Sequence, residues 1–358
     1  MHLVNNFDTL YVADSYKLTE YFMHFNPNHA AQEGSGIYGL PFSPEESRVV
    51  LFPVPWEAAA CKESGTAGAP REIFKASYLI DLFDIDLGFF YKPGIALLPE
   101  DESIREWNKQ ALKLAERINQ RSLSQQQNER YVRALNTISE EVNNFIMLRT
   151  REYLKNNKIV GIIGGDHSVS FGAIRAIHDI YSKMGVLQID AHADMRKEYN
   201  GLHHSHASVM FNVMTKTSIE KLVQVGVREF CEEEHQFAQT MRNRVTTFFD
   251  QNVSNSFFLG SNWSLVCEEI VSELPDEIYI SVDADGFDPT LCRHSSTPVP
   301  GGLSFQQFSY LLKTIIQSKR KIVGFDLTEV SSNSFDAAVG ARILLKLIGW
   351  TLRSQQIV

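Results

Sequence analysis

Three side chains that can bind a metal ion alternate along one short stretch of the chain, directly after an apolar run. The stretch is Asp190-Ala-His192-Ala-Asp194, and the residues before it, 184–189, are mostly apolar. In an extended backbone, residues two apart project from the same face. A strand that ends here would therefore aim two carboxylates and one imidazole at one point. Taken alone, the stretch also fits a solvated polar loop.

Two other apolar runs end in the same kinds of side chain. The run 159–163 breaks into Gly-Gly and is followed closely by His167. The run 278–282 is followed by Asp283 and Asp285. Both runs, like the first, are rich in Val, Ile and Leu, which is typical of buried parallel strands. Ligands of open α/β sheets bind beyond the carboxyl ends of such strands, so the three ends predict one shared site.

The three strand ends supply six candidate metal ligands: His167, Asp190, His192, Asp194, Asp283 and Asp285. Four of them are carboxylates, which would repel one another and raise each other's pKa without a metal. Two divalent cations bridged by shared carboxylates would relieve that repulsion. An oxygen-rich set with two imidazoles favours manganese over zinc or copper, and it leaves nickel and cobalt open.

The motifs resemble the three signatures of the ureohydrolase family, which comprises arginase, agmatinase, formimidoylglutamase and guanidino-acid hydrolases. They are Gly-Gly-Asp-His-Ser, Asp-Ala-His-Ala-Asp and Ser-Val-Asp-Ala-Asp-Gly-Phe-Asp-Pro, in family order. The likeness covers residues 49–348. It implies the arginase-like fold, a three-layer α-β-α arrangement with a mostly parallel central sheet. It also implies hydrolysis of a guanidino compound to urea and an amine by two manganese ions per subunit.

The resemblance assigns a ligand set to each ion. The first ion would have His167, Asp190, Asp194 and Asp283, and the second Asp190, His192, Asp283 and Asp285. Asp190 and Asp283 would therefore bridge the two ions. Two ions that share one water lower its pKa and present hydroxide at neutral pH, which attack on a resonance-stabilised guanidinium carbon needs.

The same resemblance gives Asp194, His206 and Glu329 as catalytic residues. Glu329, in Asp-Leu-Thr-Glu-Val, would pair with the substrate guanidinium, and His206 would pass a proton to the leaving amine. The string Ser-His-Ala-Ser-Val-Met around His206 is more similar to agmatinases than to arginases. Agmatine, cleaved to putrescine in polyamine metabolism, is therefore the expected substrate.

Candidate substrate contacts are Arg196, Ser208, Arg293 and Thr297. Arg196 replaces the Asn that arginases usually carry, and Cys231 falls where they carry an aspartate for the α-amino group, so arginine is disfavoured. Arg196 or Arg293 would suit the carboxylate of a guanidino acid such as 4-guanidinobutyrate. That acid, arginine and, as a weaker match, formimidoylglutamate stay open as alternatives.

Two other classes share part of the pattern. A mononuclear zinc deacetylase has an arginase-like fold, but it needs only an Asp-x-His pair and one further Asp. A non-enzymatic protein could use the ligands to brace strand ends, but that role would tolerate loss of Glu329. Metal stoichiometry and urea release separate these classes from a binuclear ureohydrolase.

Strands that alternate with helices predict a parallel sheet covered by helices on both faces. We expect a single domain over residues 1–358, with an N-terminal appendage at 1–45 and a helical insertion at 103–157. By resemblance, the loop 56–68 lines the substrate entrance. Apolar and acidic residues alternate at 82–87, which predicts an edge strand. Further strands are expected at residues 48–55, 221–227 and 321–327.

Composition narrows the class of protein. The 358 residues are 44% hydrophobic and 22% charged, as in ordinary globular proteins. A net charge of -9 argues against nucleic acid or an anionic membrane as partner. The four cysteines form no CxxC pair, and we find neither a signal sequence nor a transmembrane stretch, so the cytoplasm is the default. The family resemblance implies a small-molecule guanidino substrate and a homo-oligomer, either a trimer or a hexamer.

Overall fold

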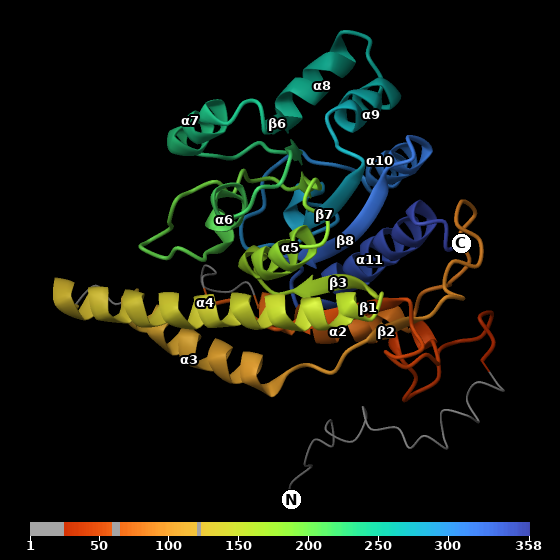
Figure 1. Ribbon diagram of the computed structural model, residues 1–358, viewed down its shortest axis with the longest axis horizontal. Coiled ribbons are helices and arrows are strands. Elements are labelled where there is room, and N and C mark those ends of the chain that lie inside the picture. Colours follow the sequence, from red (N-terminus) through yellow and green to blue (C-terminus); the bar gives the residue numbers. More distant parts are fainter. Residues whose placement is uncertain (1–24, 59–64, 120–122) are drawn as a thin grey trace, which may run out of the picture.

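A parallel sheet runs through the computed structural model, which describes residues 25–58, 65–119 and 123–358 (Figure 1). Within these residues its eight strands have the order β2-β1-β3-β8-β7-β4-β5-β6, and all neighbours are parallel. The strands are β1 (Val49–Val54), β2 (Ile95–Leu97), β3 (Ile159–Gly164), β4 (Gly185–Ile189), β5 (Leu222–Val225), β6 (Val245–Phe248), β7 (Glu277–Asp283) and β8 (Lys321–Thr328).

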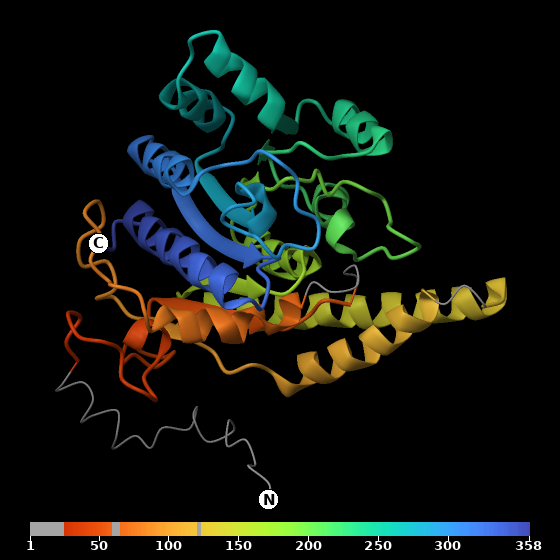
Figure 2. The same ribbon diagram turned by 180° about the vertical axis from the view of Figure 1, so that it is seen from behind.

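Helices cover both faces of this sheet, as Figures 1 and 2 show from opposite sides. The α-helices of the described residues are α2 (Ala69–Ser77), α3 (Glu102–Ile118), α4 (Gln125–Lys155), α5 (Ser170–His178), α6 (Val209–Lys216), α7 (Glu232–Thr240), α8 (Asp250–Phe258), α9 (Trp263–Ser272), α10 (Phe305–Gln317) and α11 (Ser334–Ser354). Side chains of α2, α9, α10 and α11 pack in the core on one face. Those of α3, α4, α5 and α6 pack on the other. The expected α/β class with a parallel central sheet is confirmed.

The central strands are apolar throughout because they are buried on both faces. Along β3, Ile159 and Ile163 belong to the core beneath α2 and α11, whereas Val160 and Ile162 belong to the core beneath α4. Such burial explains why the motif strands are continuous in Val, Ile and Leu rather than alternating. The expected strands at 48–55, 221–227 and 321–327 match β1, β5 and β8, whereas β6 was not expected.

The predicted edge strand at 82–87 is wrong. This segment forms turns with one isolated bridge, between Asp84 and Gly88, and Ile85 is 92% exposed. Asp84 accepts hydrogen bonds from the backbone of Asp86 and Leu87, which favours a turn over a strand. The sheet edge is occupied instead by β2, whose backbone pairs with β1.

The range 103–157 contains α3 and α4, which pack against each other. Helix α4 begins at Gln125, where Ser124 and Gln127 form a capping box. Residues 25–45 pack on the main body: the Tyr38 hydroxyl donates to the Ala341 carbonyl on α11 at 2.8 Å. The other parts of two predicted segments, 1–24 of the appendage and 59–64 of the entrance loop, lie outside the described residues. No helix among the described residues is long and apolar enough to cross a membrane.

Gly172 permits the close approach of α5 to α4, and Gly172→Ala should lower the free energy of unfolding by about 1–3 kcal/mol, as overpacking usually does. A Cβ there would lie 2.4 Å from the backbone oxygen of Asn143 on α4. Gly340→Ala is the matched control, because the nearest atoms to its Cβ would be Val330 methyl groups, at 3.2 Å. The higher helix propensity of Ala offsets that contact. Urea denaturation measures both variants, and equal effects would contradict the prediction.

Candidate active site

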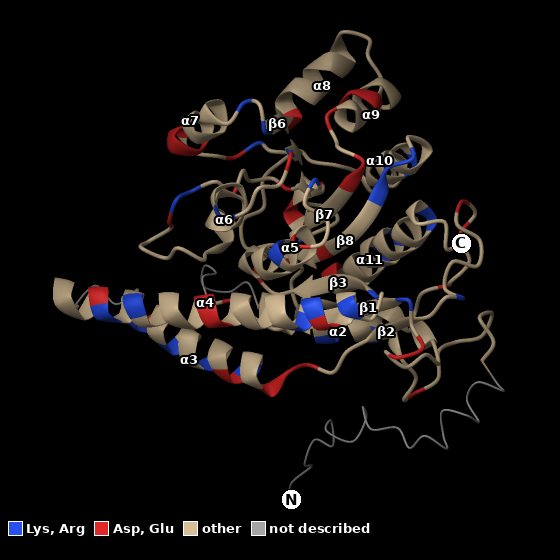
Figure 3. Cartoon of the chain, in the orientation of Figure 1, with Lys and Arg blue, Asp and Glu red and all other residues tan. Residues whose placement is uncertain are grey.

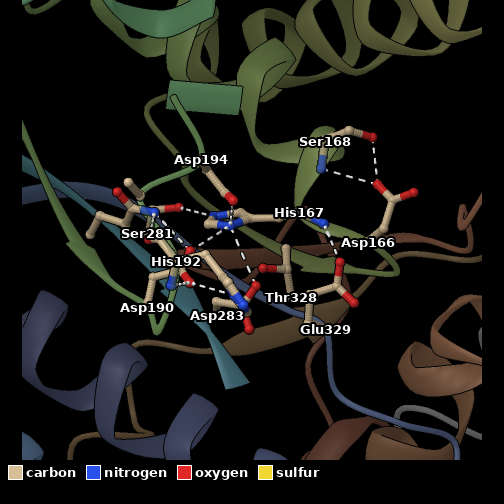
Figure 4. Close-up of polar contacts among 12 residues, drawn as sticks. Asp166, His167, Ser168, Asp190, His192, Asp194, Ser281, Asp283, Thr328 and Glu329 are labelled. Atoms are coloured by element: carbon tan, nitrogen blue, oxygen red, sulfur yellow. Dashed lines mark hydrogen bonds and ion pairs between the residues drawn. The ribbon is translucent and has the colours of Figure 1, made fainter. Parts of the chain in front are cut away.

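The carboxyl ends of four adjacent strands, β3, β8, β7 and β4, meet at one edge of the sheet and bring all six expected ligands together. His167 follows β3, and Glu329 directly follows β8. Asp190, His192 and Asp194 follow β4, while Asp283 ends β7 and Asp285 lies in the turn after it. Figure 4 shows Asp190, Asp194 and Asp283 pointing toward the His167 ring.

His167 is the centre of the first cluster. Its Nδ1 atom lies 3.1 Å from Oδ2 of Asp190, 2.9 Å from Oδ2 of Asp194 and 3.5 Å from Oδ2 of Asp283. All four side chains are buried. Three carboxylate oxygens thus surround one imidazole nitrogen, and a set of nitrogen and oxygen donors of this kind suits a divalent cation.

His192 is the centre of the second cluster. Its Nδ1 atom lies 3.6 Å from Oδ1 of Asp190 and 3.1 Å from Oδ2 of Asp285. Asp190 therefore turns one oxygen to each imidazole, as a carboxylate that bridges two ions must. Within the described residues, two triads have ligand atoms close enough to share an ion: His167, Asp190 and Asp283, and Asp190, His192 and Asp285.

The electrostatics of the site show how strongly the carboxylates interact. Burial, together with the charge of Asp190, raises the pKa of Asp194 to about 7. Burial and the charges of Asp285 and Asp190 raise the pKa of Asp283 well above its usual range. Burial opposes the charged form of His192, but its bonds to Asp190 and Asp285 outweigh that and raise its pKa to about 12. Without a cation, this cluster therefore retains protons on both acids and imidazoles at neutral pH.

The other ring nitrogen of His167 fixes the orientation of this imidazole. Nε2 lies 2.9 Å from the Ser281 hydroxyl, which in turn donates to Oδ1 of Asp326 at 3.0 Å. Because the Ser281 proton goes to Asp326, the hydroxyl oxygen can accept from Nε2–H. Loss of the Nδ1 proton would then leave a lone pair directed at the carboxylate cluster, as a metal ligand needs.

Gly165, two residues before His167, lets the chain pass close to the residues that follow β1. A Cβ on Gly165 would lie 1.8 Å from the backbone oxygen of Trp56, so a side chain cannot be accommodated there. The next residue, Asp166, accepts hydrogen bonds from the backbone N–H of Ser168 at 3.0 Å and from its hydroxyl, and so caps the turn that carries His167 (Figure 4).

Two of the expected catalytic residues have left-handed backbone conformations. The φ angles are 54° for Asp194 and 56° for Glu329. Positive φ is uncommon outside glycine and persists only where the surroundings enforce it. Here the Asp194 carbonyl accepts from the amides of Met210 and Phe211 on α6, at 3.0 and 3.1 Å, and the Glu329 amide donates to the Gly165 carbonyl at 2.8 Å.

Glu329 lies beside the ligands and forms no ion pair with a Lys or Arg of the described residues. Its Oε1 atom accepts from the backbone N–H of His167 at 3.0 Å. Burial, and next the charge of Asp166, raise the pKa of Glu329 well above its usual range. A cationic ligand that reached this carboxylate would stabilise its charged form.

The cavity at this sheet edge has a volume of about 170 Å³ and contains most of the remaining candidates. Arg196, His206 and Thr297 line it, together with Glu229 and Glu234, and the ring of Tyr199 packs edge-on against His206. Ser208 and Arg293 do not line it. Ser208 is buried and bonds the Ser205 hydroxyl, and the exposed Arg293 guanidinium lies over the Phe335 ring at 4.2 Å.

Arg196 is already paired inside this cavity. Its Nε lies 3.6 Å from Oε2 of the buried Glu234, and its guanidinium lies over the Tyr199 ring at 5.4 Å. Glu234 also accepts from the backbone N–H groups of Met195 and Cys231, at 3.0 and 2.8 Å. Cys231 itself is the residue that precedes α7, and its side chain does not line the cavity.

Sequence reasoning missed several residues that shape the site. Arg228 donates to the carbonyls of Gly226, Asp285 and Val299, at 2.9, 2.7 and 3.0 Å, and so ties the end of β5 to the ligand turn after β7. The sequence signal for it was only an Arg directly after a buried strand. Glu229 was also missed; its Oε2 lies 3.5 Å from Nε2 of His192 at the mouth of the cavity.

Comparisons with known proteins agree with this geometry. The arginase family model matches residues 47–349. An N(1)-aminopropylagmatine ureohydrolase of Thermus thermophilus is 30% identical over 298 residues, which are 83% of this chain and 87% of that protein. An agmatinase of Halalkalibacterium halodurans is 27% identical over 194 residues, 52% of this chain and 63% of that protein. The structure of the agmatine ureohydrolase of Thermoplasma volcanium has the same fold, with a TM-score of 0.69 at 21% identity over 95% of this chain and 99% of that one.

Metal binding to this site should release protons and weaken as the pH falls. Because the pKa values of Asp194, Asp283 and His192 are raised, a cation must displace their protons at neutral pH. We expect about one or more protons released per ion near pH 7, and progressively weaker binding from about pH 8 to about pH 6. Calorimetric titration of the chelator-treated protein with a divalent cation, in buffers of different ionisation enthalpy, measures both. Affinity independent of pH, without proton release, would contradict the prediction.

Proposed function

The chain belongs to the arginase family of ureohydrolases, and on that premise we propose that it uses two manganese ions to cleave a guanidino amine to urea and a shorter amine. Agmatine, which gives putrescine, is the leading substrate. The observation that carries this choice is the charge of the cavity: carboxylates lie at both its inner end and its mouth, and its arginine is already neutralised by Glu234.

The inner end suits a guanidinium group. Glu329 is a buried carboxylate beside the ligand clusters, and its backbone-fixed orientation allows a charge-assisted, two-point contact with a planar guanidinium. Such a contact would place the guanidinium carbon over the ligands of the two ions. The metal pair, when bound, would supply a hydroxide at neutral pH. His206, which lines the same cavity, is placed to transfer a proton to the leaving amine.

The mouth suits an amine rather than a carboxylate. Glu229 lines it with a 64% exposed side chain, and α7 begins nearby with three glutamates, Glu232, Glu233 and Glu234, seen as red in Figure 3. Among the lining residues that the structure describes, Arg196 is the one arginine or lysine, and Glu234 pairs with it. Among these described lining residues, a guanidino acid would therefore find no free cation for its tail, and arginine none for its carboxylate.

A longer amine is the second candidate. Glu229 lies 3.5 Å from His192 through Oε2, but its side chain is 64% exposed, so a substrate that extends out of the cavity could reach the carboxylate. N(1)-aminopropylagmatine has a further amino group beyond agmatine, and relatives that match most of this chain are named for its hydrolysis. The same acidic mouth would accept either amine.

Three further parts of the proposal concern the metal, the assembly and the compartment. The oxygen-rich ligand set supports manganese. Exposed apolar side chains in one segment, at Leu79, Phe83, Ile85 and Phe89, with the rings of Phe83 and Phe89 in contact, support a homo-oligomer, a trimer or a hexamer, because large exposed apolar patches often mark interfaces. Unpaired thiols at Cys231, Cys267 and Cys292 support a reducing compartment, the cytoplasm.

Urea release from a panel of substrates tests the choice directly. The manganese-loaded protein should cleave agmatine and N(1)-aminopropylagmatine far faster than arginine or 4-guanidinobutyrate, and it should release no formamide from formimidoylglutamate. Glu229→Gln should raise KM for both amines by about two- to fivefold, as expected for an exposed ion pair. Glu268→Gln, an exposed glutamate on α9, is the control. A preference for the guanidino acid in the wild-type protein would overturn the assignment.

Glu329→Gln should abolish most activity without emptying the metal centre. The amide cannot neutralise the guanidinium, so kcat/KM should fall by about a hundredfold or more, comparable to the loss of one preorganised polar contact. Manganese stoichiometry, measured by elemental analysis after desalting, should stay at two ions per chain, because Glu329 lies outside both ligand triads. Loss of the metal together with the activity would show that Glu329 acts as a ligand instead.

A further inference from the structure

A continuous row of polar side chains crosses the middle of the apolar sheet. Five strands contribute one residue each at matching register: Asp326 on β8, Ser281 on β7, Gln188 on β4, Gln224 on β5 and Thr247 on β6. The first four are buried and Thr247 is half-buried. Buried polar groups cost free energy unless they are hydrogen-bonded, so a row of this length must be satisfied internally.

The glutamine half of this row ends on a candidate metal ligand. The Thr247 hydroxyl donates to Oε1 of Gln224 at 2.8 Å, and Nε2 of Gln224 donates to Oε1 of Gln188 at 2.7 Å. Nε2 of Gln188 then donates to Oδ2 of Asp190, also at 2.7 Å. Three hydrogen bonds thus connect the edge strand β6 with the carboxylate that faces both imidazoles.

Backbone carbonyls fix the direction of these hydrogen bonds. Nε2 of Gln224 also donates to the Ala193 carbonyl at 2.8 Å, and Nε2 of Gln188 also donates to the His192 carbonyl at 3.4 Å. A carbonyl can only accept, so both amides must turn their NH₂ groups toward the segment 190–194. Their oxygens then face away from it and accept from the preceding member of the row.

Asp190 is consequently held at both oxygens. Gln188 donates to Oδ2, and the backbone N–H of His192 donates to Oδ1 at 2.6 Å. With one donor on each oxygen, the carboxylate cannot rotate about its Cβ–Cγ bond without losing a hydrogen bond. Oδ2 lies 3.1 Å from Nδ1 of His167 and Oδ1 lies 3.6 Å from Nδ1 of His192, so each oxygen faces one imidazole, as bridging requires.

We propose that Thr247, Gln224 and Gln188 form a positioning relay that orients Asp190 and the segment 190–194, and thereby sets the affinity of the metal centre. The relay rests on the metal centre of the proposed function but not on the identity of the substrate. Gln188 and Gln224 contact no substrate; they act through Asp190 and through the backbone that carries His192 and Asp194. Hydrogen bonds behind metal ligands commonly change metal affinity by about ten- to a hundredfold.

Two neighbouring threonines of β6 provide the sharpest test. Thr247 donates to Gln224, whereas Thr246 donates to Glu273 at 2.9 Å on the other side of the strand. Thr247→Val should weaken manganese binding about threefold, somewhat less than the full effect of one neutral hydrogen bond. Thr246→Val should leave it unchanged, and Thr247→Ser should restore it, because serine keeps the donor. Gln188→Leu, which acts directly on Asp190, should weaken binding by about tenfold or more.

The measurements are calorimetric titration of chelator-treated protein with Mn²⁺ and the electron paramagnetic resonance spectrum of the loaded protein. A change in the spectrum for Thr247→Val but not for Thr246→Val would show that the effect reaches the ligands, which general loosening of β6 would not do. Equal affinities for the wild type, Thr247→Val and Gln188→Leu would overturn the relay even if urea is released from agmatine. Weaker binding in both relay variants, with no urea released from any guanidine, would retain the relay and reject the substrate. Failure of the wild type to bind manganese would reject both.

Discussion

Mutual repulsion among buried carboxylates is the constraint on which the rest of this structure depends. Asp190, Asp194, Asp283 and Glu329 come within reach of one another at the edge where β3, β8, β7 and β4 end. Burial raises the pKa of Asp194, Asp283 and Glu329, because a charged form surrounded by other acids and little water is unfavourable. A protein gains no stability by gathering acids in this way. Their arrangement is intelligible as a site whose missing positive charge is provided by cations and by a cationic substrate.

The backbone around the site has unfavourable conformations at two of the residues that carry these acids. Asp194 and Glu329 adopt positive φ, and their peptide groups are bonded to α6 and to Gly165. Gly286, in the turn after β7, lies very close to the end of β4. A Cβ on Gly286 would be 2.6 Å from the amide nitrogen of Asp190. Arg228 then ties the turn after β7 to the end of β5. The ligands are therefore positioned by a rigid set of backbone contacts rather than by the ions alone, which is what a preorganised metal site requires.

The metal-ligand motifs were predictable because each is local: a buried strand, then two or three polar residues at alternating positions. The polar row was not, since Gln188 and Gln224 are 36 residues apart and meet only through the register of β4 with β5. In the sequence each glutamine is a single polar residue within an apolar strand. The edge strand expected at 82–87 failed for a related reason, because alternation cannot distinguish a strand from a turn in which Phe83 and Ile85 face solvent. The pairing of Arg196 with Glu234 likewise depends on tertiary structure, and it changes what Arg196 can recognise.

The pairing of Arg196 with Glu234 concerns only one of two functions proposed for the cavity: selection of the substrate tail, as distinct from chemistry at the guanidinium. In the proposed function, chemistry at the guanidinium would need the ligands and Glu329, which any substrate of this class would share. Selection among substrates depends on the mouth, where the net charge is set by how many carboxylates remain unpaired. If Arg196 were free, it would attract the carboxylate of a guanidino acid; held by the buried Glu234 and stacked on Tyr199, it serves as part of the wall. In the proposed function, Glu229 then contributes negative charge where a substrate tail would enter, which would favour an ammonium group. In the proposed function, the partner of one arginine can thus change which tail the mouth accepts, with the metal centre left as it is.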